Sequence, residues 1–286
     1  MKNAFIPVKL SPQKLQMVDT IEAITLEYKQ LGYKLTLRQL YYQLVSRDLI
    51  PNKQAEYAKI SSLLKDARMM GLIDWDIIED RLRVPKYPYF YEGVKEAIID
   101  TAKTYRINRQ DKQPVYVEVW AEKDALSSII YKVTSYYHVK MMVNRGYTSC
   151  SAMHDAYWRC RTQHKPCTIL YLGDHDPSGL DMVRDIRERF QEFGLDVNVQ
   201  KIALTTEQVK SYNPPPNPAK VTDPRAKKYI EEFGEVSWEV DALKPDVLDR
   251  LLRESIESEI DMYMFQRLLK VEQEQRDMLF EIGEAV

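Results

Sequence analysis

The strongest constraint on the fold is a short apolar run that ends in an acidic loop. Residues 168–172 have the length of a buried strand, and they stop at a glycine followed by Asp174 and Asp176. The Pro-Ser-Gly segment at 177–179 is typical of a turn into a helix that we expect to begin near Leu180. Ligands of open α/β sheets bind at the carboxyl ends of strands, so both carboxylates are expected at a binding edge.

A second strand-like run, residues 114–121, ends in Glu122. Three carboxylates at one sheet edge repel one another unless a cation is present. Oxygen ligands on a loop suit magnesium, so we interpret Glu122, Asp174 and Asp176 as ligands of Mg²⁺, with Mn²⁺ as a possible replacement. The alternative for Asp-x-Asp is an Asx turn that caps the following helix. His175, between the two aspartates, could contact a substrate, but we expect it to be a spacer that faces solvent.

A third informative segment lies upstream. Residues 36–39, Thr-Leu-Arg-Gln, have the form of a capping box, so a helix is expected to start at Thr36. On this helix Arg38 and Tyr42 share one face, and a guanidinium one turn from a phenol can hold a phosphate that the phenol oxygen approaches. Alternatively, Tyr41 and Tyr42 are ordinary aromatic residues of an amphipathic helix, since a chain with 19 tyrosines easily contains a chance pair.

The segments around this helix predict a winged-helix domain over residues 1–110. Helices are expected after Ser11-Pro12 and over 54–70, and the alternating run 72–78 is expected to form a strand and wing. In a winged helix the third helix enters the major groove and cations contact phosphates, although such domains also bind proteins. The residues expected on DNA are Lys59, Lys65, Arg68, Arg81 and Arg83.

The charge distribution agrees with a phosphate-binding face in this first part. Residues 1–110 contain 18 Lys plus Arg against 13 Asp plus Glu, whereas the whole chain has a net charge of −2. No apolar run approaches the roughly 20 residues that span a bilayer, and the amino terminus lacks the apolar core of a signal peptide. We therefore expect a cytoplasmic protein, associated with the nucleoid if it is cellular, with no membrane partner.

Residues 111–286 predict an α/β domain. Strand-like and helix-like segments alternate from residue 114 to 204, which favours a mostly parallel sheet, and long amphipathic helices follow from Asp246. The proline-rich stretch 213–218 is expected to lack regular structure. The run 236–243 alternates like a strand, and its Glu239 and Asp241 would either reach a second metal or form a salt-bridged sheet edge. The fold class is thus mixed α/β, with a winged helix before the α/β domain.

Two motifs carry a family resemblance. Glu122-Lys123-x-Ala125, followed by Gly173-Asp174-x-Asp176-Pro177-x-Gly179, resembles the Toprim domain of topoisomerases, primases and related nucleases. Asp-x-Asp-Pro-x-Gly, preceded in the chain by Arg38-x-x-Tyr41-Tyr42, resembles the A subunit of topoisomerase VI and its meiotic double-strand-break relatives. In that family a winged-helix domain precedes the Toprim domain, in the same order as here.

The resemblance implies a magnesium-dependent, DNA-binding, type IIB topoisomerase A-like enzyme, in compact form. By it, Tyr42 is the nucleophile that forms a 5′-phosphotyrosyl link, Arg38 its phosphate partner, and Glu122, Asp174 and Asp176 the metal ligands. Two breaks in double-stranded DNA require two nucleophiles, so a homodimer is expected. Because no ATP-binding fold is evident, strand passage would need a separate ATPase subunit.

Two other functions stay open at this point. In the first, the protein is a Toprim hydrolytic nuclease of a phage-defence or plasmid-control complex, where the same metal activates water and Tyr42 is a bystander. In the second, it is a DNA-binding scaffold without chemistry of its own.

Overall fold

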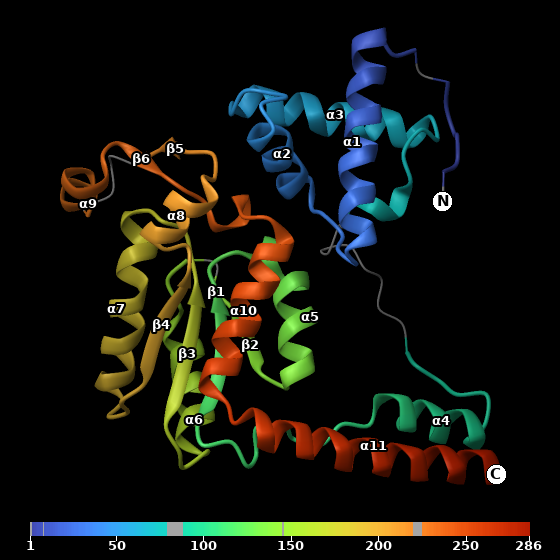
Figure 1. Ribbon diagram of the computed structural model, residues 1–286, viewed down its shortest axis with the longest axis vertical. Coiled ribbons are helices and arrows are strands. Elements are labelled where there is room, and N and C mark those ends of the chain that lie inside the picture. The colour runs from blue at the N-terminus through green and yellow to red at the C-terminus, as the bar shows by residue number, and fades with distance from the viewer. Residues whose placement is uncertain (1, 8, 79–87, 145, 220–224) are drawn as a thin grey trace.

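The computed structural model describes residues 2–7, 9–78, 88–144, 146–219 and 225–286 (Figure 1). It is a mixed α/β structure in which three amino-terminal helices sit above a parallel sheet covered by helices. The amino-terminal helices are α1 (Pro12–Gln30), α2 (Leu37–Ser46) and α3 (Gln54–Met69). Both helix starts predicted from local capping signals are confirmed, because Ser11 caps α1 and Thr36 forms a capping box with Gln39 at the start of α2.

The strand predicted over 72–78 is wrong. This segment is a turn followed by the 3₁₀ helix η1 (Trp75–Ile77), and its Ile78 makes only an isolated bridge with Leu35. The apolar alternation reflects core packing instead, since the side chains of Ile73 and Ile77, four residues apart, are both buried. The expected wing, including Arg81 and Arg83, lies outside the described residues.

The predicted parallel sheet is confirmed. It has four strands in the order β2-β1-β3-β4, with every neighbouring pair parallel. Strands β1 and β3 lie in the centre, so the two runs singled out in the sequence are adjacent in space. The strands are β1 (Tyr116–Ala121), β2 (Lys140–Val143), β3 (Cys167–Leu172) and β4 (Asn198–Ala203).

Helices cover both faces of the sheet, which explains why β1 and β3 are buried along their whole length. Val117 and Val119 of β1 belong to the core cluster under α5 and α10, whereas Trp120 belongs to the cluster under α6 and α7. Between the sheet and α6, Glu118 is buried and paired with Arg159. The covering helices are α5 (Ser127–Tyr137), which follows η2 (Asp124–Leu126), α6 (Cys150–Arg161), α7 (Pro177–Glu192) and α10 (Pro245–Glu259).

Helix α4 (Val94–Thr104) packs along the carboxyl-terminal helix α11 (Met262–Ala285) rather than on α1–α3 (Figure 1). A Cβ atom at Gly283 would lie 2.7 Å from Ile99, so this glycine permits the close approach of the two helices. Just after α4, Arg109 forms a buried ion pair with Glu272 of α11. Residues 94–110, which the sequence groups with the winged helix, therefore contact the end of the chain.

The segment between β4 and α10 covers the edge of the sheet at which the strands end. Two predictions here need correction, because Asn217 and Pro218 form a short strand, β5, and the run 236–243 is strand only at β6 (Val236–Ser237) before η3 (Val240–Ala242). Strands β5 and β6 pair antiparallel. The other elements are α8 (Thr206–Tyr212) and α9 (Ala226–Phe233). Across the described ranges, every helix is too short or too polar to cross a membrane.

Candidate functional site

The two acidic sequence motifs meet at the carboxyl ends of neighbouring strands. Glu122 follows β1 and Asp174 follows β3, and the Glu122 Oε2 atom accepts a 3.1 Å hydrogen bond from the backbone N–H of Asp174. The Asp174 Oδ1 atom accepts a further bond of 2.9 Å from the backbone N–H of Val240. The sheet register, rather than any local pattern, brings these carboxylates together.

Asp176 has a different role in this structure. It is the N-cap of α7, which begins at Pro177 rather than near Leu180 as predicted. Its Oδ1 atom accepts hydrogen bonds from the backbone N–H of Gly179 at 2.6 Å and from the Ser178 hydroxyl at 3.0 Å. The capping alternative considered for Asp-x-Asp therefore describes Asp176 well.

The expectation that His175 faces solvent is wrong. Its side chain is fully buried, and its two ring nitrogens lie 3.0 Å from the hydroxyls of Tyr229 and Thr206. Its backbone also exchanges two hydrogen bonds with that of Trp238. Burial lowers the pKa of His175, which keeps the ring neutral near pH 7. His175 thus anchors the acidic loop to the segment that covers it.

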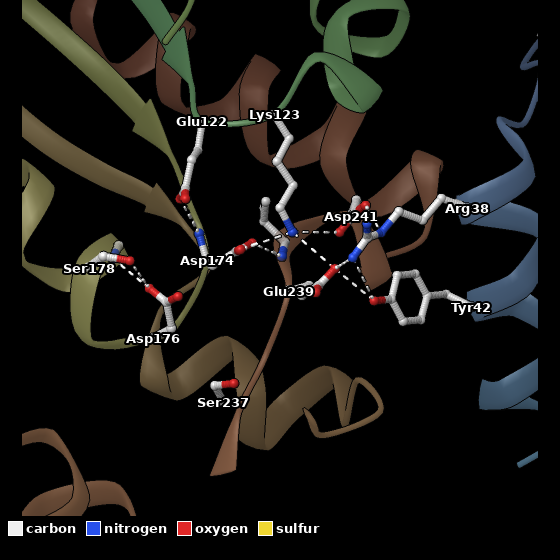
Figure 2. A network of polar contacts seen from close by, with 12 residues as sticks. Arg38, Tyr42, Glu122, Lys123, Asp174, Asp176, Ser178, Ser237, Glu239 and Asp241 are labelled. Atoms are coloured by element: carbon white, nitrogen blue, oxygen red, sulfur yellow. Dashed lines mark hydrogen bonds and ion pairs between the residues drawn. The ribbon is translucent and has the colours of Figure 1, made fainter. Parts of the chain in front are cut away.

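Lys123 is the centre of the site. Its ammonium lies 2.9 Å from Asp174 Oδ2, 3.0 Å from Glu239 Oε2 and 3.1 Å from Asp241 Oδ1. Burial lowers the pKa of Lys123, but these three carboxylates raise it more strongly, so the ammonium stays charged. The cation links the strand ends to the segment that contains η3 (Figure 2).

Tyr42 and Arg38 of α2 reach the same network from the amino-terminal helices (Figure 2). The Tyr42 hydroxyl donates a 2.7 Å hydrogen bond to Glu239 Oε2. The Arg38 Nη2 atom lies 2.5 Å from the same oxygen, and its Nε atom lies 3.3 Å from Asp241 Oδ2. The predicted proximity of Arg38 and Tyr42 is present, with Nη2 3.5 Å from the phenol oxygen.

The electrostatics of this network keep Tyr42 protonated. Burial, the hydrogen bond to Glu239 and the charge of that carboxylate raise the pKa of Tyr42, and the nearby charge of Arg38 offsets only part of this. Burial raises the pKa of Glu239 as well, but Lys123, Tyr42 and Arg38 lower it overall to about 2. In this arrangement a neutral phenol donates a hydrogen bond to a charged carboxylate.

The predicted metal ligands do not converge on one point here. In Figure 2 Asp176 points toward Ser178, and among the described residues no group of three acidic, histidine or cysteine side chains could hold a metal ion as placed. The donor chemistry nevertheless fits a hard divalent cation, because the buried oxygens are carboxylates. Burial and the charges of Glu122 and Asp241, only partly offset by Lys123, raise the pKa of Asp174 to about 7. The carboxylates at this edge of the sheet thus carry more negative charge than the nearby cations neutralise.

The predicted DNA-binding residues of α3 differ in their surroundings. Lys59 and Lys65 are exposed; Lys59 lies 2.6 Å from Glu56 and Lys65 lies 3.6 Å from Asp66, both on the same helix. Arg68 instead donates hydrogen bonds to the carbonyls of Trp75 and Ile78, and its guanidinium lies 5.6 Å from the Trp75 ring centroid. Arg68 therefore supports the turn after α3, while the two lysines remain available to a ligand.

Sequence reasoning missed the central position of Lys123 and the complete burial of the Asp241 side chain. The usable signal was the pair of acids in the otherwise apolar run 236–243, since a buried acid requires a cationic partner. A cavity of about 380 Å³ opens beside this network. It is lined by polar and aromatic side chains, among them Arg38, Tyr42, Tyr57, Gln54 and Glu239.

No protein-family model matches this sequence, and no curated protein is significantly similar to it.

Proposed function

We propose that the protein cleaves double-stranded DNA by tyrosine transesterification, as a topoisomerase VI A-like enzyme. The observation that supports this most is the continuous polar network from Tyr42 and Arg38 to Glu122 and Asp174. A phenol, a guanidinium and a sheet edge rich in carboxylates are the groups that phosphodiester transesterification uses.

The reaction starts when a DNA phosphate enters the cavity beside Tyr42. Arg38 keeps 49% of its side chain exposed, so it can turn from Glu239 to the phosphate and neutralise the charge that develops there. Once Arg38 moves to the phosphate, Glu239 loses one of the cations that lower its pKa, so this pKa rises toward the ordinary carboxylate range. Glu239 can then accept the phenol proton across the existing 2.7 Å hydrogen bond.

In the chemical step the Tyr42 oxygen bonds to phosphorus while the bond from phosphorus to the 3′ oxygen breaks. The leaving oxygen takes a proton from water, and the 5′ phosphate stays on Tyr42. Glu122, Asp174 and, after release from its cap, Asp176 would hold a magnesium or manganese ion, whose chemistry there is to stabilise charge on the leaving oxygen. A twofold dimer would place one Tyr42 on each strand, and strand passage would need a separate ATPase.

A second candidate is a hydrolytic nuclease that uses the same edge. It is favoured by the raised pKa of Tyr42, which burial and the bond to Glu239 cause, because a phenol held protonated is a weak nucleophile. In this case the carboxylates serve a metal-activated water, and Tyr42 only fastens α2 to the sheet edge.

Trapping of the cleaved DNA separates the two candidates. Supercoiled plasmid is incubated with protein and magnesium or manganese, denatured with detergent and digested with protease. Protein-linked breaks that vanish in Tyr42→Phe but persist in Tyr41→Phe support transesterification; Tyr41 is a matched control because its hydroxyl bonds Asn52 and the Lys53 carbonyl instead. Free-ended breaks that persist in Tyr42→Phe and vanish in Asp174→Asn support hydrolysis. Plasmid that binds but stays intact contradicts both.

A further inference from the structure

A large cavity of the described structure lies away from the acidic edge. This groove, of about 1020 Å³, runs beside β2, which is an outer strand of the sheet. It is bounded by β2, by the end of α4 with the residues that follow, and by the carboxyl-terminal half of α5. The register places residues 140–142, which line the groove, beside residues 118–120 of β1, so the groove runs along the outer strand rather than over the strand ends that carry Glu122 and Asp174.

The groove is cationic. Its lining contains Lys103, Arg106, Arg109, Lys140 and Arg159, and none of the lining residues is Asp or Glu. Glu272 neutralises Arg109 through a buried ion pair, and the buried Glu118 neutralises the partly buried Arg159. Lys103 and Lys140 are exposed, and Arg106 stays 39% exposed although it lies 3.7 Å from Glu272. The three exposed cations can therefore meet an anionic ligand.

Two exposed tyrosines stand among these cations. The side chain of Tyr131 on α5 is 66% exposed and that of Tyr136 is 41% exposed. The ring of Tyr136 is held in place by edge contacts with Tyr137 and Phe265 and by the Arg109 guanidinium, 5.8 Å from its centroid. Exposed aromatic rings beside cations form the surface on which unpaired bases stack while phosphates are neutralised.

We propose that this groove binds single-stranded nucleic acid. Lys103, Arg106 and Lys140 contact backbone phosphates, and Tyr131 and Tyr136 stack on bases. A duplex is disfavoured because its base faces are already covered by neighbouring bases. An acidic peptide would use the cations but would leave the two rings unused. The proposal does not depend on the chemistry at Tyr42.

Fluorescence anisotropy with labelled oligo-dT, oligo-U and a mixed-sequence duplex tests the proposal. We expect Tyr131→Ala to weaken single-strand binding roughly tenfold and to leave duplex binding unchanged. In Lys103→Glu/Lys140→Glu we expect the affinity for single strands to fall more than tenfold. The slope of log affinity against log salt concentration should become shallower by about 0.7 for each phosphate contact removed. The matched control is Lys59→Glu/Lys65→Glu on α3, which we expect to affect duplex binding only.

Binding of either oligo-dT or oligo-U with these effects supports the proposal. It is overturned if the groove variants bind both oligonucleotides like the parent. The proposal is also overturned if Lys103→Glu/Lys140→Glu loses affinity equally for oligo-dT and for a polyglutamate peptide, while Tyr131→Ala changes the affinity for neither ligand. Circular dichroism of each variant verifies folding. A photo-crosslink to Tyr131 or Tyr136 from an oligonucleotide that contains bromodeoxyuridine gives a second readout. An oligonucleotide bound elsewhere on the protein does not form this crosslink.

Discussion

The hydroxyl of Tyr42 donates its hydrogen bond to Glu239, 197 positions later in the sequence, at 2.7 Å. Together with Arg38, which pairs with Glu239 and Asp241, this contact fastens α2 to the segment that covers the sheet edge. The phenol and the acidic edge are thus positioned by the same few polar contacts. Substitutions at these residues should change both the stability of the protein and any chemistry at the site.

Tyr42→Phe should lower the free energy of unfolding by about 1–2 kcal/mol, since it removes one hydrogen bond to a charged acceptor. Glu239 keeps Arg38 and Lys123 as partners, which limits the loss. Urea unfolding of the variant beside the parent measures the difference. An unchanged midpoint would mean that this hydrogen bond adds nothing to stability in solution.

Lys123→Met should destabilise the protein by about 3–5 kcal/mol, because it leaves the buried Asp174 and Asp241 and the half-buried Glu239 without their shared cation. Lys140→Met is a suitable control, since Lys140 is exposed. Thermal unfolding with and without magnesium extends the test. We expect magnesium to raise the Tm of Lys123→Met more than that of the parent, and equal shifts would place the ion elsewhere.

Gly179→Ala should disrupt the acidic loop. A Cβ atom at this position would lie 2.2 Å from the backbone oxygen of Asp174, and a backbone atom cannot move aside as a flexible side chain can. We expect a loss on the order of 3 kcal/mol in the free energy of unfolding. Gly93→Ala is the matched control, because among the described residues no atom beyond its chain neighbours lies within 4 Å of its Cβ position. Equal stability of the two variants would contradict the close approach at Gly179.

The Arg109–Glu272 pair should make stability dependent on pH. Burial raises the pKa of Glu272, but hydrogen bonds from Arg109 and from the Ile107 N–H lower it overall. Because the pKa of this carboxyl group is lower in the folded than in the unfolded protein, the ion pair contributes its full stability at a pH above the unfolded pKa of about 4.3. This contribution is lost as the pH falls through the folded pKa. We expect Glu272→Gln to cost about 3 kcal/mol at pH 7.

The same comparison at low pH provides the check on this pair. Protonated Glu272 resembles glutamine, so the difference between Glu272→Gln and the parent should shrink as the pH falls below about 4. Chemical unfolding of both proteins at pH 7 and at a pH below about 4 measures this difference in the free energy of unfolding. A difference that does not change with pH would show that the carboxylate charge is not what stabilises the contact.

Local signals in the sequence determined much of the fold. The caps at Ser11 and Thr36 located two helix starts, because a side chain that bonds the first free N–H groups acts within one turn. The buried runs before Glu122 and Asp174 located β1 and β3, since strands covered on both faces are continuously apolar. The placement of these two acids at strand ends followed directly from the same pattern.

Other features depended on contacts between distant segments. His175 is buried only because the chain around Tyr229 and Trp238 folds over it, and the run 72–78 packs as a turn because Ile73 and Ile77 meet a core that lies elsewhere in the chain. In both places the local pattern was compatible with more than one conformation, and packing decided between them.

The sequence by itself thus determined the starts of α1 and α2, the two central strands and the strand ends at which Glu122 and Asp174 lie. The tertiary structure decided that Lys123 is the cation shared by three carboxylates and that Tyr42 faces Glu239. The physical reason is that secondary structure depends on interactions between near neighbours, which leave a periodic pattern in the sequence. An ion pair or hydrogen bond across the fold leaves no such pattern, because its partners are brought together only by the packing of whole elements.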